Sequence, residues 1–369
     1  MFDHIEIPKE LLPKDGRFGC GPSLVRPEFV EELAREAKTY LGTSHRQAKV
    51  KDKVGSAFQL LRQYYSVPAD YKIAMGNGSA SIVWDMMVFG LIEKKSVHYS
   101  NGEFSSKSFA STQGANWIEA KQIKVENGTV PNFVEHEGYD VHCLAWNETS
   151  TGAMYPNTPT VKNSLLAIDA TSAIGALKWD LTKSDLVYFS PQKAFGSEGG
   201  LWIGIFSPKA LSQIERVKKS GRYIPPMLDF TTALKNAESN QTYNTPSLST
   251  LYFLEKQLQH FCKQGLDAVH REQVEKTKLL HAWVDGRKEL SHYVQNPEHR
   301  SMTVSTINVV PEIPYDQLTK RLRKFGIVDI DCYRNLGANQ IRISLFPNIT
   351  RDDLQKLTQS IDYLLDYRK

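Results

Sequence analysis

The sequence has few cysteines and no motif that would pair them or bind zinc with them. Its 369 residues include Cys20, Cys143, Cys262 and Cys332, which lie far apart without a C-x-x-C pair. We therefore expect neither a disulfide framework nor a metal site. The chain also lacks an apolar run of about 18 residues, so no membrane-spanning helix is expected. The N-terminal sequence MFDHIEIPKELLPKDG is charged where a secretory signal is apolar, which predicts a cytoplasmic protein.

A large excess of one charge is also missing. Lys and Arg number 45 against 41 Asp and Glu, a net charge of +4 that is spread evenly along the chain. This balance does not indicate nucleic acid or an anionic membrane as a partner. Hydrophobic residues make up 41% of the chain, enough for a sizeable core, so a disordered or fibrous protein is excluded. The length predicts two domains, or one large and one small.

Short apolar segments alternate with helical patterns over the first two thirds of the chain. The predicted strands are residues 141–146, 165–169, 186–190 and 201–206, and the predicted helices are residues 27–41 and 82–92. This alternation predicts an α/β fold with a large, mainly parallel sheet between layers of helices.

The pattern changes near residue 265, where a smaller α+β domain is expected. Its predicted helices are residues 267–287, 314–325 and 350–367, and its predicted strands are residues 302–310, 327–333 and 340–346. We predict a large domain at residues 16–263, a small domain at 264–369, and an N-terminal segment, residues 1–15, associated with the small domain.

Chemically useful residues follow four of the predicted strands. An open parallel sheet binds its ligands beyond the carboxyl ends of its strands. Thr149, Asp169 and Lys193 each end or follow a strand, and the sequence G-N-G-S-A-S at residues 76–81 opens the apolar helix. Unpaired N–H groups at a helix start can hold a phosphate. The motif is neither a Walker loop nor a full G-x-G-x-x-G, and by itself it is equally well explained as an ordinary strand-to-helix turn.

Lys193 and Asp169 together favour a pyridoxal-phosphate enzyme. An amine after a buried strand can form a Schiff base with a carbonyl cofactor, and an aspartate beside the ring nitrogen keeps that nitrogen protonated. Taken singly, Lys193 is better explained as a surface lysine, and Asp169 could cap a helix that begins at Ala170. The chain order of phosphate turn, acid and lysine is what favours the cofactor.

These residues resemble the class V, fold-type I aminotransferases, and most closely the branch that acts on phosphoserine. The resemblance covers essentially the whole chain. Its motifs are F-G-C-G-P-S at 18–23, S-H-R at 44–46, N-E-T at 147–149, D-A-T-S at 169–172, Q-K at 192–193, Y-N-T-P at 243–246 and Q-I-R-I-S at 340–344. The S-H-R triplet is the most discriminating element for that branch.

The resemblance implies a cofactor site for pyridoxal 5'-phosphate. Lys193 would bind the cofactor aldehyde and shuttle a proton, Asp169 would pair with the ring nitrogen, and Thr149 would bond the ring oxygen. Phe104 would stack on the ring, where many relatives have tryptophan. The cofactor phosphate would be held by Gly78, Ser79 and Gln192, and by Asn244 and Thr245 of a neighbouring subunit, which implies a homodimer with shared sites. Ser79 stands where many relatives carry arginine.

The resemblance also implies the substrates. Arg342 would bind the substrate α-carboxylate through a bidentate pair. His45 and Arg46 would bind the substrate phosphate, with Arg334 as a second ligand in a segment that is longer than in many relatives. The implied reaction exchanges an amino group between glutamate and 3-phosphohydroxypyruvate in serine biosynthesis, with a possible side role in making vitamin B6.

Two alternatives stay open from the sequence. One is another class V enzyme, such as a serine–glyoxylate or alanine–glyoxylate aminotransferase, although its small neutral substrates would not need the pair His45 and Arg46. The other is a nucleotide-binding or scaffold protein that uses the G-N-G-S-A-S turn. The second alternative predicts a colourless protein, whereas an enzyme with bound cofactor is yellow.

Overall fold

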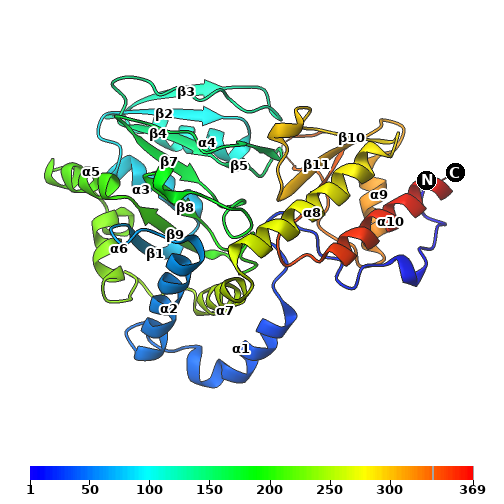
Figure 1. Cartoon of the computed structure of the whole chain (residues 1–369), viewed down its shortest axis with the longest axis horizontal. Helices are drawn as coiled ribbons and strands as arrows, with labels where there is room; N and C mark the ends of the chain where they lie inside the picture. Colours follow the sequence, from blue (N-terminus) through cyan, green and yellow to red (C-terminus); the bar gives the residue numbers. More distant parts are fainter. Residues whose placement is uncertain (335, 369) are drawn as a thin grey trace.

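A seven-stranded sheet forms the centre of the larger part of the molecule (Figure 1). The computed structural model describes residues 1–334 and 336–368. The strands, in their order across the sheet, are β1 (Lys72–Gly78), β9 (Gly200–Phe206), β8 (Leu186–Phe189), β7 (Leu165–Asp169), β4 (Val141–Ala145), β2 (Lys95–Ser100) and β3 (Glu119–Lys124). Strand β9 runs antiparallel to both neighbours, and the other neighbouring pairs are parallel. The predicted mainly parallel sheet is confirmed.

Helices cover both faces of this sheet, which explains why its strands are apolar throughout. In β7, Leu165 and Ala167 pack into one core, while Leu166 and Ile168 pack into another on the opposite face. The first core includes residues of α3 (Ala80–Gly90), α5 (Pro208–Lys219) and α6 (Phe230–Ala237). The second includes residues of α1 (Pro27–Tyr40), α2 (Ala48–Tyr65) and α7 (Leu248–Gln264). Helix α4 (Glu103–Gln113) lies against β2.

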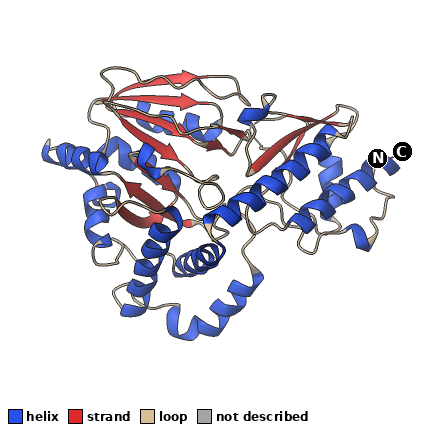
Figure 2. Cartoon of the chain, in the orientation of Figure 1, coloured by secondary structure: helices blue, strands red, loops and turns tan. Residues whose placement is uncertain are grey.

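A separate three-stranded antiparallel sheet lies toward the C-terminus (Figure 2). Its strands are β10 (Leu290–His292), β11 (Val304–Val309) and β12 (Gln340–Ser344), and its helices are α8 (Leu266–Asp285), α9 (Tyr315–Arg323) and α10 (Arg351–Tyr367). Phe2, Ile5 and Ile7 pack into the same core, and the two termini lie close together at this end of the molecule (Figure 1). These contacts support, as a proposal, the division into residues 1–15, 16–263 and 264–369.

The remaining elements are short. They are the hairpin β5 (Asn147–Glu148) with β6 (Ala153–Met154), and the 3-10 turns η1 (Lys9–Leu11), η2 (Leu181–Lys183), η3 (Pro226–Leu228) and η4 (Pro297–His299). Among the helices that the structure describes, none has the length and apolar character needed to cross a bilayer.

The strand predicted at residues 327–333 is wrong. This segment is irregular and makes only two isolated bridges, Arg17 with Val328 and Asp331 with Ile341. Ile327 and Ile330 are buried, so the apolar pattern reflects contact with the core rather than a ladder of hydrogen bonds. The left-handed backbone of Asp329, with φ of 65°, breaks the extended conformation between them.

Candidate active site

The carboxyl ends of β1, β4, β7 and β8 meet at one edge of the large sheet. The N–H of Trp146 donates to the Asp169 carbonyl, and the N–H of Ala170 donates to the Tyr188 carbonyl, both at 2.9 Å. The N–H of Ala80, at the start of α3, donates to Ser190 Oγ at 2.5 Å. The last bond ties the glycine-rich turn to the loop that carries Lys193. The four strand-end groups found in the sequence therefore share one location.

Lys193 lies at the centre of this location and is almost completely buried. Its Nζ donates to Thr149 Oγ1 at 2.6 Å. A Cβ added at Gly21 would come within 2.9 Å of Lys193 Cε, so the glycine leaves room for the lysine side chain. Burial lowers the pKa of Lys193 to about 8, against the opposing charges of Asp169 and Glu148. The amine is thereby closer to the neutral, nucleophilic form than a lysine in water.

Asp169 faces the same interior and interacts electrostatically with Lys193. Burial raises the pKa of Asp169, while hydrogen bonds from Thr171 and the charge of Lys193 act in the opposite direction. Thr171 donates its N–H and its hydroxyl to Asp169 Oδ1 at 3.0 and 2.5 Å. An acid and an amine thus occupy one buried pocket region, as the sequence hypothesis requires.

An aromatic ring and a threonine complete the surroundings of the lysine. Lys193 Nζ lies 4.8 Å from the centroid of the Phe104 ring, which is on the first turn of α4. Thr149 Oγ1 also bonds Ser172 Oγ at 2.9 Å, and Ser172 Oγ bonds Asn147 Nδ2 at 2.8 Å. Thr149 is therefore held on a fixed network rather than on a mobile loop.

The glycine-rich turn presents serine hydroxyls at the start of α3, where the N–H of Ala80 is bonded to Ser190 and the N–H of Ile82 to the Ser79 carbonyl. Strand β1 ends at Gly78, whose φ of 122° suits glycine, and Ser79 precedes the helix without capping it. Ser79 Oγ and Ser81 Oγ lie 2.7 Å apart. Gln192 Oε1 is buried and has no hydrogen-bond partner in the described chain. These donors and this amide provide the kind of polar groups that hold a phosphate.

Arg342, in the middle of β12, reaches the same site from the small sheet. Its Nη1 donates to the Thr149 carbonyl at 3.0 Å, and its guanidinium lies 5.0 Å from the Tyr333 ring centroid. Its Nε is buried and unpartnered within the described residues. Tyr333 also makes an edge contact with Phe104, at 6.0 Å between centroids. The guanidinium thus keeps donor capacity for an anionic group near Lys193.

The remaining predicted residues form a second group beside the turn. His45 Nδ1 lies 3.0 Å from Thr245 Oγ1, and Asn77 Nδ2 donates to the Thr245 carbonyl at 2.6 Å. Arg46 Nη1 donates to Gln241 Oε1 at 3.2 Å. Asn244 and Thr245 are exposed, as is Arg334 in the loop that carries Tyr333. The structure therefore brings His45, Arg46 and Thr245 together. Arg334 is exposed and makes no hydrogen bond to these three residues within the described chain.

Residues 19–357 match the aminotransferase class-V family. The chain belongs to the class V aminotransferases. It is 45% identical to the phosphoserine aminotransferase of Corynebacterium glutamicum, over 99% of this chain and 98% of that protein. Among solved structures, it is similar to a phosphoserine aminotransferase of Cytophaga hutchinsonii, with a TM-score of 0.88, 26% identity, and coverage of 94% of this chain and 99% of that one.

Class V aminotransferases use pyridoxal phosphate, and the residues present here fit that cofactor. The fold is shared with a phosphoserine aminotransferase of Trichomonas vaginalis solved with the cofactor bound, with a TM-score of 0.83, 20% identity, and coverage of 95% of this chain and 100% of that one. In this chain, the buried Lys193 amine can bind the cofactor aldehyde and the Asp169 carboxyl can pair with the ring nitrogen. The side-chain amide of Gln192, whose oxygen has no partner in the described residues, can direct its NH₂ group toward a phosphate.

Sequence reasoning missed two residues that the structure places beside this site. Glu148, at the end of β5, is completely buried against the first turn of α4, and Tyr333 contacts both Phe104 and Arg342. Glu148 could have been noticed, because it stands inside the N-E-T motif directly after the apolar segment at residues 141–146. Nothing in the sequence around Tyr333 indicates its contacts.

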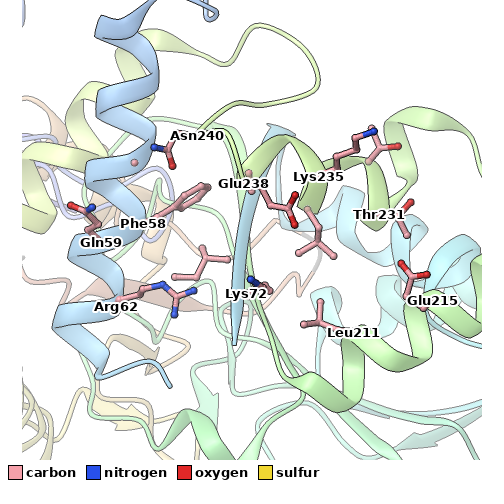
Figure 3. A pocket seen from close by; sticks show the side chains of 15 residues that line it. Phe58, Gln59, Arg62, Lys72, Leu211, Glu215, Thr231, Lys235, Glu238 and Asn240 are labelled. Atoms are coloured by element: carbon pink, nitrogen blue, oxygen red, sulfur yellow. The ribbon is translucent and has the colours of Figure 1, made fainter. Parts of the chain in front are cut away.

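A hollow between α2, β1, α5 and α6 lies at the other end of β1 from this site, and its lining is shown in Figure 3. It has a volume of about 730 Å³ and is surrounded by side chains of α2, β1, α5 and α6, including Arg62, Lys72 and Glu215. Lys72 begins β1 and Gly78 ends it, so the hollow and the phosphate turn are separated by the strand's length, roughly 20 Å. Size alone would have directed attention to the wrong end of the sheet.

Proposed function

We propose that this protein catalyses transfer of an amino group from L-glutamate to 3-phosphohydroxypyruvate, yielding O-phospho-L-serine and 2-oxoglutarate, in L-serine biosynthesis. The observation that carries the proposal is full-length identity of 45% to a phosphoserine aminotransferase, combined with a matching lysine site. A side role in making vitamin B6 is a possible extension that the same chemistry allows. The two half-reactions share one site, so ping-pong kinetics are expected.

Each residue of the site has a defined task in this proposal. Bound pyridoxal phosphate supplies an aldehyde for the amine and a ring that withdraws electrons from the substrate. Lys193 holds that aldehyde and then carries the proton at the substrate Cα. Asp169 keeps a proton on the ring nitrogen, and Thr149 orients Lys193 Nζ. Phe104 packs on the ring, while Gly78, Ser79 and Gln192 bind the phosphate.

Arg342 binds the α-carboxylate that both substrates share, because its guanidinium is close to Lys193 and has an unpartnered Nε. His45 and Arg46, with Arg334 as a further candidate, bind the second anion, which is a phosphate in one substrate and a carboxylate in the other. Burial and the charge of Arg46 lower the pKa of His45, so in this proposal Arg46 supplies the positive charge and His45 a neutral hydrogen-bonding group for either acid.

A screen of half-reactions tests the proposed function. The purified protein is expected to be yellow, and phosphoserine and glutamate should convert its cofactor to the pyridoxamine form, followed by absorbance. Serine and alanine should react much more slowly. A colourless protein that binds no pyridoxal phosphate, or one converted by alanine but not by phosphoserine, would overturn the proposal. Lys193→Ala should abolish the imine absorption.

We also propose a homodimer in which Asn244 and Thr245 reach the cofactor phosphate of the neighbouring subunit. Both residues are exposed, and Asn244 Nδ2 lies 3.1 Å from Met227 Sδ, which joins their loop to the loop of Tyr223. Tyr223 is 77% exposed and Tyr243 is 43% exposed. Exposed aromatic side chains on adjoining loops are typical of a surface that binds a partner. We further propose a cytoplasmic location, where the four free cysteines stay reduced.

A further inference from the structure

Glu148 is a buried carboxylate that makes no direct ion pair within the described residues, although its charge acts on the nearby Lys193. It has no exposed surface, and no ion pair reaches it. A charge in such a place is costly unless hydrogen bonds compensate for the lost water. Five hydrogen bonds compensate here. They come from the start of α4 and from the hairpin after β4, so Glu148 connects these two segments.

The bonds divide between the two carboxylate oxygens. Oε1 accepts from the N–H of Phe104 at 3.3 Å, and from the N–H and hydroxyl of Ser150 at 3.2 and 2.7 Å. Oε2 accepts from the N–H and hydroxyl of Ser105 at 2.9 and 2.8 Å. The first turn of a helix has N–H groups with no internal partner, and here the carboxylate satisfies two of them.

Gly102 allows this close approach. A Cβ at Gly102 would come within 2.4 Å of Glu148 Cγ, so any other residue there would displace the acid. Ser150 extends the junction, because its hydroxyl also accepts from the N–H of Glu103 at 3.0 Å. The start of α4 is thus bonded at three consecutive residues to the segment that contains Thr149.

The hydrogen bonds of Glu148 connect Phe104 and Thr149, the two residues that contact the Lys193 amine. Phe104, bonded through its N–H to Glu148, places its ring 4.8 Å from Lys193 Nζ, and Thr149, the next residue after Glu148, accepts from that same Nζ. We propose that Glu148 is a positioning residue that fixes the Phe104 ring relative to Thr149 and Lys193, and so sets the slot for the cofactor ring. The inference rests on the proposed use of pyridoxal phosphate.

Glu148→Gln is the sharpest variant, because it keeps the size of the side chain and removes one acceptor oxygen. The amide must turn its NH₂ toward either the Ser105 N–H or the N–H groups of Phe104 and Ser150, and a backbone N–H cannot reverse its polarity. The pyridoxal phosphate dissociation constant is expected to rise about tenfold, as for the loss of a hydrogen bond to a charged group. The visible circular dichroism of the bound cofactor should be mostly lost, and amide hydrogen exchange at residues 103–105 should accelerate.

Glu135→Gln is the matched control. Glu135 likewise accepts from backbone N–H groups of Lys162, Asn163 and Ser164, but these precede β7 at its amino end, away from Asp169. This variant should lose stability while its cofactor spectrum and affinity stay as in the wild type. If Glu148→Gln does not fold, Ser150→Ala keeps the acid and removes the Ser150 hydroxyl, which donates to Glu148 Oε1 and accepts from the N–H of Glu103. A smaller change in the same direction is expected.

The outcomes separate the inference from the proposed function. A wild-type protein that binds no pyridoxal phosphate refutes the function itself. A yellow wild type with Glu148→Gln unchanged in circular dichroism and affinity refutes the positioning role alone. If Glu135→Gln loses as much cofactor affinity and circular dichroism as Glu148→Gln, the positioning role is also refuted. That result would show that both changes come from a general loss of stability. Should Glu148→Gln not fold, an unchanged spectrum in Ser150→Ala counts against the inference.

Discussion

The reactivity of Lys193 is set by its surroundings more than by its own chemistry. The interior disfavours the ammonium form, while Asp169 and Glu148 favour it, and burial prevails. The result is an amine whose neutral fraction changes near physiological pH. Tyrosines such as Tyr188 on β8 are buried in the same region, where the pKa of Tyr188 is raised well above its usual range by burial, so they stay protonated hydroxyls.

The pH dependence of cofactor binding should therefore report on Lys193. The neutral amine reacts with the aldehyde, so the second-order rate of pyridoxal phosphate binding to the cofactor-free protein should rise with pH and level off above about 8. A solvent-exposed lysine with an ordinary pKa would instead give a binding rate that keeps rising toward about pH 10. Stopped-flow absorbance between about pH 6.5 and 9.5, which brackets the pKa of about 8, measures this rate. A rate that shows no midpoint below pH 9 would contradict the role of burial.

Arg46 should determine preference for the phosphorylated substrate. Replacing Arg46 by alanine is expected to raise the KM for 3-phosphohydroxypyruvate about tenfold or more, because a phosphate loses a charge-assisted bond. Pyruvate and glyoxylate, which lack that anion, should be used with little change. Arg35→Ala removes another exposed arginine, on α1, and serves as the control. Equal losses for all three oxo acids would count against the substrate assignment.

Residues with distinctive chemistry could be predicted from the sequence, and residues that act through contacts could not. Asp169 stands out because it ends a buried strand, and Lys193 because it follows another within a few residues, where neither charge is needed for packing. The family resemblance added Arg342 and Phe104. Tyr333 is recognisable only once β12 and α4 are brought together, because its partners are Phe104 and Arg342. Sequence motifs thus identified the residues with reactive groups, such as Lys193, and did not identify those that position them through contacts, such as Tyr333.

At the scale of elements, helix α8 is joined to the end of β12 by one buried lysine. Lys276 is 1% exposed, and its Nζ donates to the carbonyls of Leu345, Phe346 and Ile349 at 2.8, 2.9 and 3.0 Å. An ammonium has three protons to donate, and all three carbonyls lie directly after the strand that carries Arg342. The lysine therefore fixes the segment that follows β12.

Lys276→Met should destabilise the protein on the order of 3 kcal/mol, because it leaves three buried carbonyls without a donor. Chemical denaturation measures the loss. Lys278→Met on the same helix is the control, since Lys278 is 69% exposed and pairs only with Glu275 in the described chain. A Lys276→Met protein as stable as Lys278→Met would show that other contacts hold the segment.

Elements with a strong pattern were predicted well, and those defined by distant partners were not. Strands β4 and β7 were found because both their faces are buried and their residues are continuously apolar. The segment at 327–333 has similar composition, yet Asp329 and the absence of a neighbouring strand along most of its length, within the described residues, leave it irregular. The antiparallel direction of β9 depends on its insertion between β1 and β8, which local sequence does not encode.

At the scale of the whole molecule, the key question is which subunit provides Asn244 and Thr245. Within one chain, the Thr245 carbonyl accepts from Asn77, one residue before Gly78. A residue beside the turn could serve its own site or that of a neighbour across a two-fold axis. In the proposed dimer, Asn244 and Thr245 serve the site of the neighbouring subunit. A subunit-mixing experiment distinguishes this arrangement from one in which they serve their own site.

Lys193→Ala subunits mixed with subunits carrying Asn244→Ala and Thr245→Ala should regain activity. If Asn244 and Thr245 act in the neighbouring subunit, each mixed dimer contains one intact site, and random mixing restores about a quarter of the wild-type activity. Denaturation and refolding of the mixture, followed by an activity assay and light scattering for mass, provides the measurement. No recovery in a mixture shown to contain dimers would assign both residues to their own chain.

The bond from Arg342 to the Thr149 carbonyl has a consequence for how substrates arrive. Between turnovers, a peptide oxygen satisfies part of the guanidinium, so the cation is never left bare in an apolar setting. If Arg342 binds the substrate carboxylate as proposed, that carboxylate must displace the Thr149 carbonyl and replaces a neutral acceptor by a charged one. Molecules without a carboxylate would gain nothing from this exchange, so the resting contact would favour acids over other molecules.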